Sequence, residues 1–278
     1  MSAATSGSSG VGRSDPAFRS AHAGCVLLQA KSVTRLFGGV RAVDGVDLAV
    51  RRGSVHGLIG PNGAGKTTLL NLIAGVFPLS AGALHFGARD ITRHSAADRA
   101  RGGIRRTFQN LRLFLEMTAL ENVAIGLHAE TRCGFTDAVL RTPRQRREES
   151  GIRERGMQAL TFVGLAGLAH ARASTLAYGH RRLLEIARAI VAAPQLLLLD
   201  EPAAGLNATE AVHVTELIGR LRERGTTIVL VEHHMDVVMS ACDEITVLNY
   251  GRKLAHGTPA AIQDDPAVIE AYLGSRRR

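Results

Sequence analysis

Short apolar runs along the chain have the pattern of strands buried on both faces of a sheet. Leu196–Leu199 is continuously apolar, Val55–Ile59 is short and β-prone, and Thr226–Val231 is rich in β-branched residues. Strands without polar alternation are typical of a parallel sheet that is covered on both sides. Ile104–Phe108 is predicted to be a further strand. The pattern predicts an α/β fold built around a parallel sheet.

Helical periodicity separates these runs. Lys66–Ala74 carries its leucines and its isoleucine at helical spacing. Thr118–Leu127 is predicted to be a helix with Thr118 as its N-cap, because Glu121 stands three residues further on and completes a capping box. Arg144–Leu160 is predicted to be a second helix of this region, with a charged face that is solvated.

The strand at Val55–Ile59 is followed by a glycine-rich loop and then by the Lys66–Ala74 helix. The loop matches the pattern G-x-x-x-x-G-K-[ST], in the strand–loop–helix context that this pattern requires. Glycines let the backbone N–H groups surround a phosphate, and the helix adds its positive end. Lys66 is placed to reach the β- and γ-phosphates, and the Thr67 hydroxyl to ligate Mg²⁺. The candidate phosphate-binding residues are Gly60, Pro61, Asn62, Gly63, Ala64, Gly65, Lys66, Thr67 and Thr68.

Two carboxylates follow the apolar run Leu196–Leu199. Ligands of doubly wound sheets lie at the carboxyl ends of the strands, so Asp200 is predicted to hold Mg²⁺. Glu201, one residue further on, is predicted to polarise the attacking water.

Polar residues also follow the other two predicted strands. Gln109 comes after Ile104–Phe108, and Glu232-His233-His234 comes after Thr226–Val231. A γ-phosphate sensor and a water-orienting amide recur in nucleotide hydrolases. The residues therefore predict a hydrolase of a Mg-nucleotide, and they leave open whether it is a motor, a kinase or a switch.

Composition indicates in which compartment and with which classes of partner this protein works. The chain has 278 residues and a net charge of +9, and its first 24 residues are small and polar, as in a disordered tail. The longest apolar stretch, Ala189–Leu199, is interrupted by Pro194 and is too short to span a membrane. Basic residues are not interleaved with aromatic residues, so we expect no nucleic-acid partner. The odd cysteine count favours a reduced, soluble protein inside the cell; the cysteines are Cys25, Cys133 and Cys242.

The order of the motifs resembles the ATP-binding cassette (ABC) family, which comprises the ATPase subunits of ABC transporters. "GPNGAGKTT" comes first, followed by "TFQN", "LAYGHRRLLEIARA", "LLLLDEPAAGLN" and "VEHHMD", and the resemblance extends from Val26 to Gly274. It implies an ABC-type P-loop core with a mixed sheet, a β-rich N-terminal subdomain and a helical insert. The expected divisions are a tail at 1–24, an ATPase domain at 25–258 with its insert at about 114–174, and a helical tail at 259–278.

The segment Thr175–Ile190 is, by its pattern alone, an ordinary amphipathic helix opened by a glycine turn. By resemblance it is the family's signature segment, usually Leu-Ser-Gly-Gly-Gln, which binds the ATP held by a partner cassette. The candidate ATP-binding residues of this turn are Ala177, Tyr178 and Gly179. Ala177 stands in place of the usual serine, so a hydroxyl contact to the γ-phosphate is missing, and Tyr178 stands in place of a glycine.

Other roles follow from the resemblance one residue at a time. Phe37 is similar to the aromatic residue that stacks on adenine, with a core phenylalanine as the alternative. Gln109 is similar to the residue that contacts Mg²⁺ and water, and Glu201 to the catalytic carboxylate. His233 is similar to the switch histidine. Asn207 replaces the more usual aspartate after the acidic pair, which affects communication between the two ATP sites.

Within the family, "NLRLF", "LAYG", "DEPAAGLN" and the C-terminal "GTPAAIQDDPAVIEAYLG" are similar to branched-chain amino-acid importers. This resemblance implies two membrane permease subunits, a second ATPase subunit that is identical or paralogous, and indirectly a substrate-binding protein. It also implies a peripheral location on the cytoplasmic face of the inner membrane. The alternatives are an ATPase of a lipopolysaccharide exporter, one of an amide or urea importer, and a non-transport ABC ATPase of DNA repair or translation.

Overall fold

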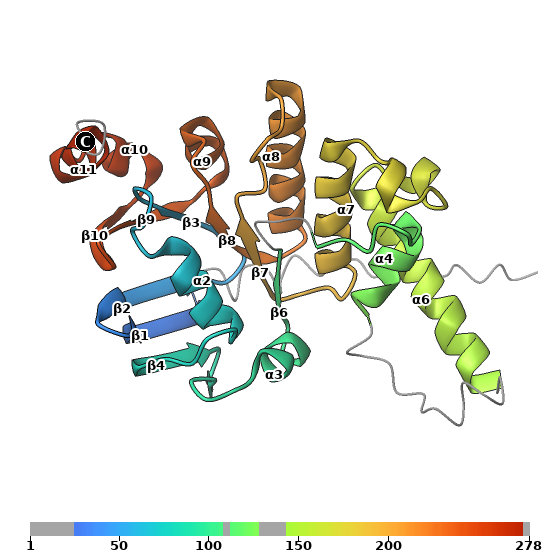
Figure 1. Ribbon diagram of the computed structural model, residues 1–278, viewed down its shortest axis with the longest axis horizontal. Helices are drawn as coiled ribbons and strands as arrows, with labels where there is room; N and C mark the ends of the chain where they lie inside the picture. Colours follow the sequence, from blue (N-terminus) through green and yellow to red (C-terminus); the bar gives the residue numbers. More distant parts are fainter. Residues whose placement is uncertain (1–24, 108–111, 128–142, 275–278) are drawn as a thin grey trace, which may run out of the picture.

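The computed structural model describes residues 25–107, 112–127 and 143–274. At its centre is a six-stranded sheet with the strand order β10-β9-β3-β8-β7-β6 (Figure 1). All neighbouring pairs in this sheet are parallel except β10 with β9, so the sheet is mixed. The strands are β3 (Val55–Ile59), β6 (Ile104–Arg106), β7 (Leu196–Asp200), β8 (Thr227–Val231), β9 (Glu244–Asn249) and β10 (Arg252–Gly257). The predicted α/β fold and its strands are confirmed, although β6 is shorter than the predicted Ile104–Phe108.

Alternate residues of the parallel strands face two different layers. In β7, Leu197 and Leu199 belong to an apolar cluster with helices on one face, whereas Leu196 and Leu198 belong to a second cluster on the other face. Because successive side chains of a strand point to opposite faces, Asp200 lies on the same face as Leu196 and Leu198. The continuous apolar run is thus explained by two buried faces.

The second cluster joins the central sheet to helix α2 (Lys66–Ala74) and to an antiparallel four-stranded sheet. The strand order of this sheet is β2-β1-β4-β5. Its strands are β1 (Val26–Phe37), β2 (Val40–Arg51), β4 (Ala81–Phe86) and β5 (Arg89–Asp90), with the short helix α3 (Ala96–Arg101) following them. The β-rich N-terminal part is therefore present and packs on the face that carries α2.

Helices cover the opposite face of the central sheet. They are α7 (Tyr178–Ile190), α8 (Ala208–Glu223) and α9 (Met235–Ala241), which share the first cluster. After β10 come α10 (Pro259–Gln263) and α11 (Pro266–Gly274), which pack beside β10. Among the described residues, each helix is too short or too polar to cross a lipid bilayer.

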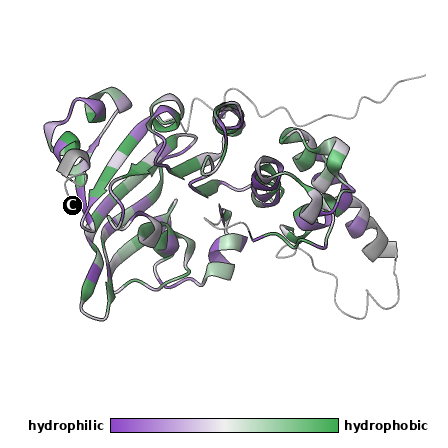
Figure 2. Ribbon diagram, turned by 45° about the horizontal axis from the view of Figure 1, so that its top comes forward, coloured by the Kyte–Doolittle hydropathy of each residue, from purple (hydrophilic) through white to green (hydrophobic). Residues whose placement is uncertain are grey.

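A helical part lies at the other end of the molecule from the four-stranded sheet, as both ribbon views show (Figures 1 and 2). It contains α4 (Ala119–Ile125) and α6 (Pro143–Phe162), which pack against each other and against α7. The predicted capping box is present, because Thr118 Oγ1 accepts from the Glu121 N–H at 3.2 Å while the Glu121 carboxylate accepts from the Thr118 N–H at 2.8 Å. The expected 1–24 tail lies outside the described residues, and the domain limits stay a prediction.

Candidate active site

The predicted site residues follow strands that run in the same direction. The glycine-rich loop follows β3, the Asp200-Glu201 pair ends β7, and Glu232-His233 follows β8. Because β3, β8 and β7 are adjacent and parallel, their carboxyl ends meet at one edge of the sheet. The fold therefore assembles segments that lie far apart in the sequence.

The phosphate loop, Gly60–Thr67, needs glycine for two different reasons. A Cβ on Gly60 would lie 2.0 Å from the Leu248 carbonyl oxygen, and a Cβ on Gly65 would lie 2.4 Å from that of Ala42. Gly63 has open space around it, but its φ of 78° lies in the left-handed region that glycine adopts at least cost. Neighbouring backbone atoms leave no room for a side chain at positions 60 and 65, whereas backbone conformation alone favours glycine at position 63.

Lys66 is turned inward onto this loop. Its ammonium is buried and donates hydrogen bonds to the carbonyl oxygens of Gly60 at 2.7 Å and Pro61 at 3.0 Å. Burial lowers the pKa of Lys66, while the negative charges of Glu201 and Asp200 oppose that change. The structure thus brings the cation of the loop within electrostatic reach of the predicted acidic pair.

Asp200 is fully buried at the end of β7. Its Oδ2 pairs with an Arg106 guanidinium nitrogen at 2.8 Å, and Arg106 also bonds the Asn71 side chain. Burial raises the pKa of Asp200, and the Arg106 partner counteracts that rise. Its other oxygen, Oδ1, is buried without a hydrogen-bond partner among the residues that the structure describes. A buried, unsatisfied carboxylate oxygen is costly, and it is the kind of ligand that a magnesium ion takes.

Glu201 has an unusual backbone conformation and a direct partner. Its φ is 51°, a left-handed conformation that costs energy for a residue with a side chain. Its N–H donates to the Val231 carbonyl at 2.8 Å, which ties the strained residue to the end of β8. Its Oε1 lies 2.9 Å from His233 Nε2. The structure therefore places the predicted water-polarising carboxylate in contact with the predicted switch histidine.

A neighbouring carboxylate, to which sequence reasoning gave no role, ties these two segments together. Glu232 is buried, its Oε1 accepts from the Ala203 N–H at 2.7 Å, and its Oε2 accepts from the His233 N–H at 3.0 Å. It thus joins the loop after Glu201 to the loop that carries His233. The only signal in the sequence was a carboxylate directly after a buried strand. Arg106 was missed as well, since its pairing with Asp200 depends on the strand order.

The signature turn, Ala177–Gly179, opens α7 and packs on the loop between β7 and α8. The N-cap residue Ala177 makes no side-chain capping bond. The Tyr178 hydroxyl donates to the Ala204 carbonyl at 3.3 Å, and a Cβ on Gly179 would lie 2.3 Å from a Glu210 carboxylate oxygen. Within the described residues no hydrogen bond connects this turn to the phosphate loop of the same chain.

Asn207 is the N-cap of α8. Its side chain accepts from the Glu210 N–H at 2.9 Å, and the Glu210 carboxylate accepts from the Asn207 N–H at 3.0 Å. Asparagine and aspartate are about equally good N-caps, so the departure from the family's usual aspartate preserves this local structure.

Phe37 lies at the end of β1 and is not a core residue. Its side chain is 39% exposed, so the alternative of a core phenylalanine is wrong. The Arg35 guanidinium carbon lies 4.6 Å from the ring centroid, and Phe77 meets the ring edge-to-face at 5.3 Å. Gln109 lies outside the described residues, so its predicted contact with magnesium and water stays a prediction.

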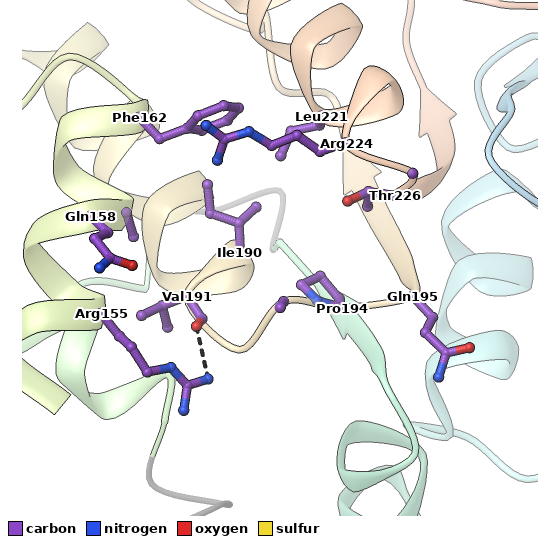
Figure 3. Close-up of a pocket in the computed structure, with 13 residues that line it drawn as sticks. Arg155, Gln158, Phe162, Ile190, Val191, Pro194, Gln195, Leu221, Arg224 and Thr226 are labelled. Atoms are coloured by element: carbon purple, nitrogen blue, oxygen red, sulfur yellow. Dashed lines mark hydrogen bonds between the residues drawn. The ribbon is translucent and has the colours of Figure 1, made fainter. Parts of the chain in front are cut away.

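Two hollows of the surface differ in their relation to this site. A groove of about 660 Å³ borders the phosphate loop and is walled on its other side by α11. A second hollow of about 450 Å³ lies between α6, the end of α7 and the end of α8 (Figure 3). There the Arg224 guanidinium carbon lies 4.0 Å from the Phe162 ring centroid, and Arg155 donates to the Val191 carbonyl at 3.1 Å. This second hollow borders the starts of β7 and β8, at the opposite end of the strands from the predicted site residues.

Comparisons with known proteins agree with this geometry. A family model described as "ABC transporter" matches residues 43–204, and one described as "Branched-chain amino acid ATP-binding cassette transporter" matches residues 252–277. The chain is 45% identical over 249 residues to the "High-affinity branched-chain amino acid transport ATP-binding protein BraF" of Pseudomonas aeruginosa, covering 89% of this chain and 98% of that protein. It is 44% identical to the protein LivG of the same description from Salmonella typhimurium, with the same coverage.

Solved structures give the same result for the fold. A nucleotide-free ATP-binding cassette from an ABC transporter superposes with a TM-score of 0.79 at 32% identity, covering 89% of this chain and 99% of that one. An ATP-binding cassette of an ABC transporter in its ADP conformation also has a TM-score of 0.79 at 32% identity, covering 90% of this chain and 99% of that one.

Proposed function

The chain belongs to the ABC transporter family of ATP-binding proteins, and from this premise we propose that it is the ATP-hydrolysing subunit of an importer for branched-chain amino acids. The observation that carries the proposal is the match of nearly the whole chain to branched-chain amino-acid transport ATP-binding proteins. The C-terminal match at residues 252–277 supports the same branch of the family.

We assign the first step, nucleotide binding, to the phosphate loop. Its N–H groups and the N-terminus of α2 attract the phosphates, because a helix start carries a partial positive charge. Lys66 exchanges its bonds with the Gly60 and Pro61 carbonyls for bonds with phosphate oxygens. The exposed ring of Phe37 is the surface assigned to adenine.

The residues suited to a magnesium ion are Thr67, in the first turn of α2, and Asp200, with Gln109 assigned by resemblance. The fit rests on Asp200 Oδ1, which is buried and without a hydrogen-bond partner among the described residues. A magnesium ion bound there would neutralise phosphate charge that develops during the reaction. Arg106 holds Asp200 through its other oxygen, Oδ2.

Hydrolysis is assigned to Glu201 and His233. The Glu201 carboxylate accepts a proton from a water molecule whose oxygen attacks the γ-phosphorus, and ADP leaves. His233 holds the Glu201 carboxylate at 2.9 Å and presents its imidazole toward the same edge of the sheet. Glu232 connects the loop that follows Glu201 to the loop that carries His233, because its carboxylate accepts from the N–H groups of Ala203 and His233.

A second cassette completes the ATP site in this proposal. Among the described residues no side chain caps the first turn of α7, and we assign its N–H groups to an anion that approaches from outside the chain. We assign Ala177, Tyr178 and Gly179 to the γ-phosphate of an ATP held by the partner cassette, which is identical or paralogous. ATP then closes the pair and hydrolysis reopens it.

We propose the further partners from the family resemblance. We assign to the complex two membrane permease subunits, contacted through the helical part, and a substrate-binding protein on the other side of the membrane. The chain then sits peripherally on the cytoplasmic face of the inner membrane. The transported substrate is recognised by these other subunits.

A pull-down tests the proposal. The Glu201→Gln chain is loaded with ATP and used to isolate partners from detergent-solubilised native membranes, which are identified by mass spectrometry. The expected result is the isolation of two permease subunits and a second cassette. The substrate-binding protein that is encoded with them should then bind leucine or isoleucine. Lipopolysaccharide-export subunits, or amide- or urea-import subunits, would overturn the assigned substrate. DNA-repair proteins or ribosomes without membrane proteins would overturn the transport function while leaving the ATPase chemistry in place.

A further inference from the structure

A buried arginine of β6 holds side chains of two other elements at the site. The Arg106 guanidinium donates to Asp200 Oδ2 at 2.8 Å through Nη2, and to the Asn71 side-chain oxygen through Nη1. The side chain of Arg106 is 8% exposed, and that of Asp200 is fully buried. A planar guanidinium can hold two acceptors in fixed directions, which an ammonium group does not do. Arg106 therefore ties α2 and β7 to β6.

These three elements carry, or lead to, the residues that we assign to the magnesium ion. Asn71 stands four residues after Thr67 on α2, and residues at this spacing lie on one face of a helix. Asp200 ends β7. In the sequence, Gln109 follows Arg106 by three positions, although Gln109 lies outside the described residues. One guanidinium is thus connected, through hydrogen bonds or through three positions of sequence, to every segment that carries an assigned ligand.

The contacts of Asp200 leave one of its oxygens for a cation. Arg106 takes Oδ2, whereas Oδ1 is buried without a hydrogen-bond partner among the described residues. The backbone of Asp200 is held as well, because its N–H donates to Thr107 Oγ1 at 3.2 Å. The Thr107 N–H in turn donates to the Leu198 carbonyl at 2.9 Å. The carboxylate is therefore held through its backbone and through Oδ2, and the orientation of Oδ1 is fixed as a result.

We propose that Arg106 is a positioning residue for the magnesium ion of the nucleotide, because it fixes the Asp200 carboxylate and, through Asn71, the helix that carries Thr67. The proposal rests on the assignment of this site to Mg-ATP. Groups that hydrogen-bond to a metal ligand orient it, and their loss typically lowers metal affinity about 10- to 100-fold. The positive charge of Arg106 repels a nearby cation, and the fixed geometry outweighs this repulsion.

The experiment measures nucleotide binding with and without the metal. A fluorescent, non-hydrolysable ATP analogue gives the Kd of each full-length chain in excess Mg²⁺ and in EDTA, so the contribution of the metal is measured without turnover. Arg106→Met removes the charge, Arg106→Lys keeps the charge but loses the planar fork, and Asn71→Ala removes only the second acceptor. Arg101→Met is the matched control, because Arg101 pairs with Asp98 at the same 2.8 Å on the exposed surface of α3.

The expected effect is confined to binding in the presence of Mg²⁺. Arg106→Met should weaken that binding about 10- to 100-fold and leave the Kd in EDTA nearly unchanged. Asn71→Ala should weaken it about three- to tenfold, because one hydrogen bond is lost while the ion pair with Asp200 remains. Arg106→Lys should lie between Arg106→Met and the unchanged chain, and Arg101→Met should match the unchanged chain.

Three results would overturn the proposal. Equal losses of affinity in Mg²⁺ and in EDTA would mean that Arg106 supports only the fold around the phosphate loop. Tighter binding in Mg²⁺ would mean that charge repulsion exceeds the gain from geometry. If Arg106→Met does not fold, Arg106→Lys and Asn71→Ala decide, and an unchanged Kd in Mg²⁺ for both is the third such result.

The same measurements separate this inference from the proposed function. If the unchanged chain binds no nucleotide, the proposed function fails, and this inference fails with it. If the unchanged chain binds and hydrolyses ATP while the Arg106 and Asn71 variants keep its Kd in Mg²⁺, only this inference fails.

Discussion

The two glycine-containing turns that we assign to ATP, the phosphate loop and the signature turn, are crowded by different kinds of atoms. At Gly60 the obstacle to a side chain is a backbone carbonyl of β9, whereas at Gly179 it is the flexible carboxylate of Glu210. Backbone cannot move without disturbing the sheet, but a carboxylate can rotate away. The fold therefore allows only glycine at position 60 of the phosphate loop. At position 179 of the signature turn, a side chain could fit if Glu210 rotated away.

Their charges differ as well. The phosphate loop carries the buried ammonium of Lys66, with Asp200 and Glu201 close enough to affect its pKa. Two residues after the signature turn, Arg181 points back along the chain and donates to the carbonyls of Ser174 at 2.6 Å and Leu176 at 2.8 Å. The attraction of an anion is left mainly to the N–H groups of the helix start. We propose that the phosphate loop binds a nucleotide by itself, whereas the signature turn complements a phosphate that is bound by another chain.

The largest expected effect comes from removing the carboxylate next to the phosphate loop. Glu201→Gln should lower steady-state ATP hydrolysis by about 10²- to 10⁴-fold, which is the usual contribution of a general base. The Kd for ATP should stay within a fewfold of the original, because the phosphate loop is unchanged. Phosphate release and binding of a fluorescent ATP analogue measure the two quantities. Glu216→Gln, on the exposed face of α8, is the control, and full activity in Glu201→Gln would disprove the assigned base.

An alanine pair tests the difference in crowding directly. Gly60→Ala should destabilise the fold by more than about 2 kcal/mol and abolish tight nucleotide binding, since its Cβ meets a carbonyl and its φ of 147° is costly for alanine. Gly179→Ala should cost only about 0.5–2 kcal/mol, because Glu210 turns aside and loses its capping bond. Chemical unfolding and nucleotide titration of both variants provide the measurements. Equal costs at the two positions would refute the contrast drawn here.

Glu232 provides the next test, since it ties the loop after the acidic pair to His233. Glu232→Gln replaces one acceptor oxygen with an NH₂ donor that faces backbone N–H groups, so one hydrogen bond is lost. A hydrogen bond to a charged carboxylate contributes about 1.5–3 kcal/mol. We expect kcat to fall by about tenfold or more, with ATP binding unchanged. Steady-state kinetics and nucleotide titration separate the two effects, and Glu223→Gln on the exposed end of α8 is the control. A weaker Kd with an unaltered kcat would place the role of Glu232 in binding instead.

The smallest effect is expected at Tyr178, which connects the signature turn to the loop after Glu201. Tyr178→Phe removes the hydrogen bond to the Ala204 carbonyl and keeps the ring beside Gly205. One exposed hydrogen bond contributes about 0.5–1.5 kcal/mol, so hydrolysis should fall by no more than about tenfold. Nucleotide binding at low protein concentration, where pairing is negligible, should not change. A loss of that binding would mean that the signature turn acts on the nucleotide of its own chain.

Sequence reasoning was most complete where the determinants are close together in the chain. The phosphate loop, helix α2 and the capping box at Thr118 all follow from spacings of a few residues, because turns and caps are built from local backbone groups. The strands β3, β7 and β8 were found because burial on both faces leaves an apolar run. Asp200 and Glu201 were predicted to be site residues because a carboxylate pair at the end of such a strand is a local pattern.

The remaining features of the site depend on which elements become neighbours. Arg106 meets Asp200 across 94 positions of sequence, and Glu232 meets Ala203 across 29. The packing of the Glu210 carboxylate beside Gly179 arises in the same way. By itself the sequence determined the phosphate loop, the acidic pair and the α/β class, because local backbone geometry and periodic burial dictate them. Only the tertiary structure decided what holds these residues in place, because hydrogen bonds between distant segments depend on strand order and packing, and a single sequence does not display these.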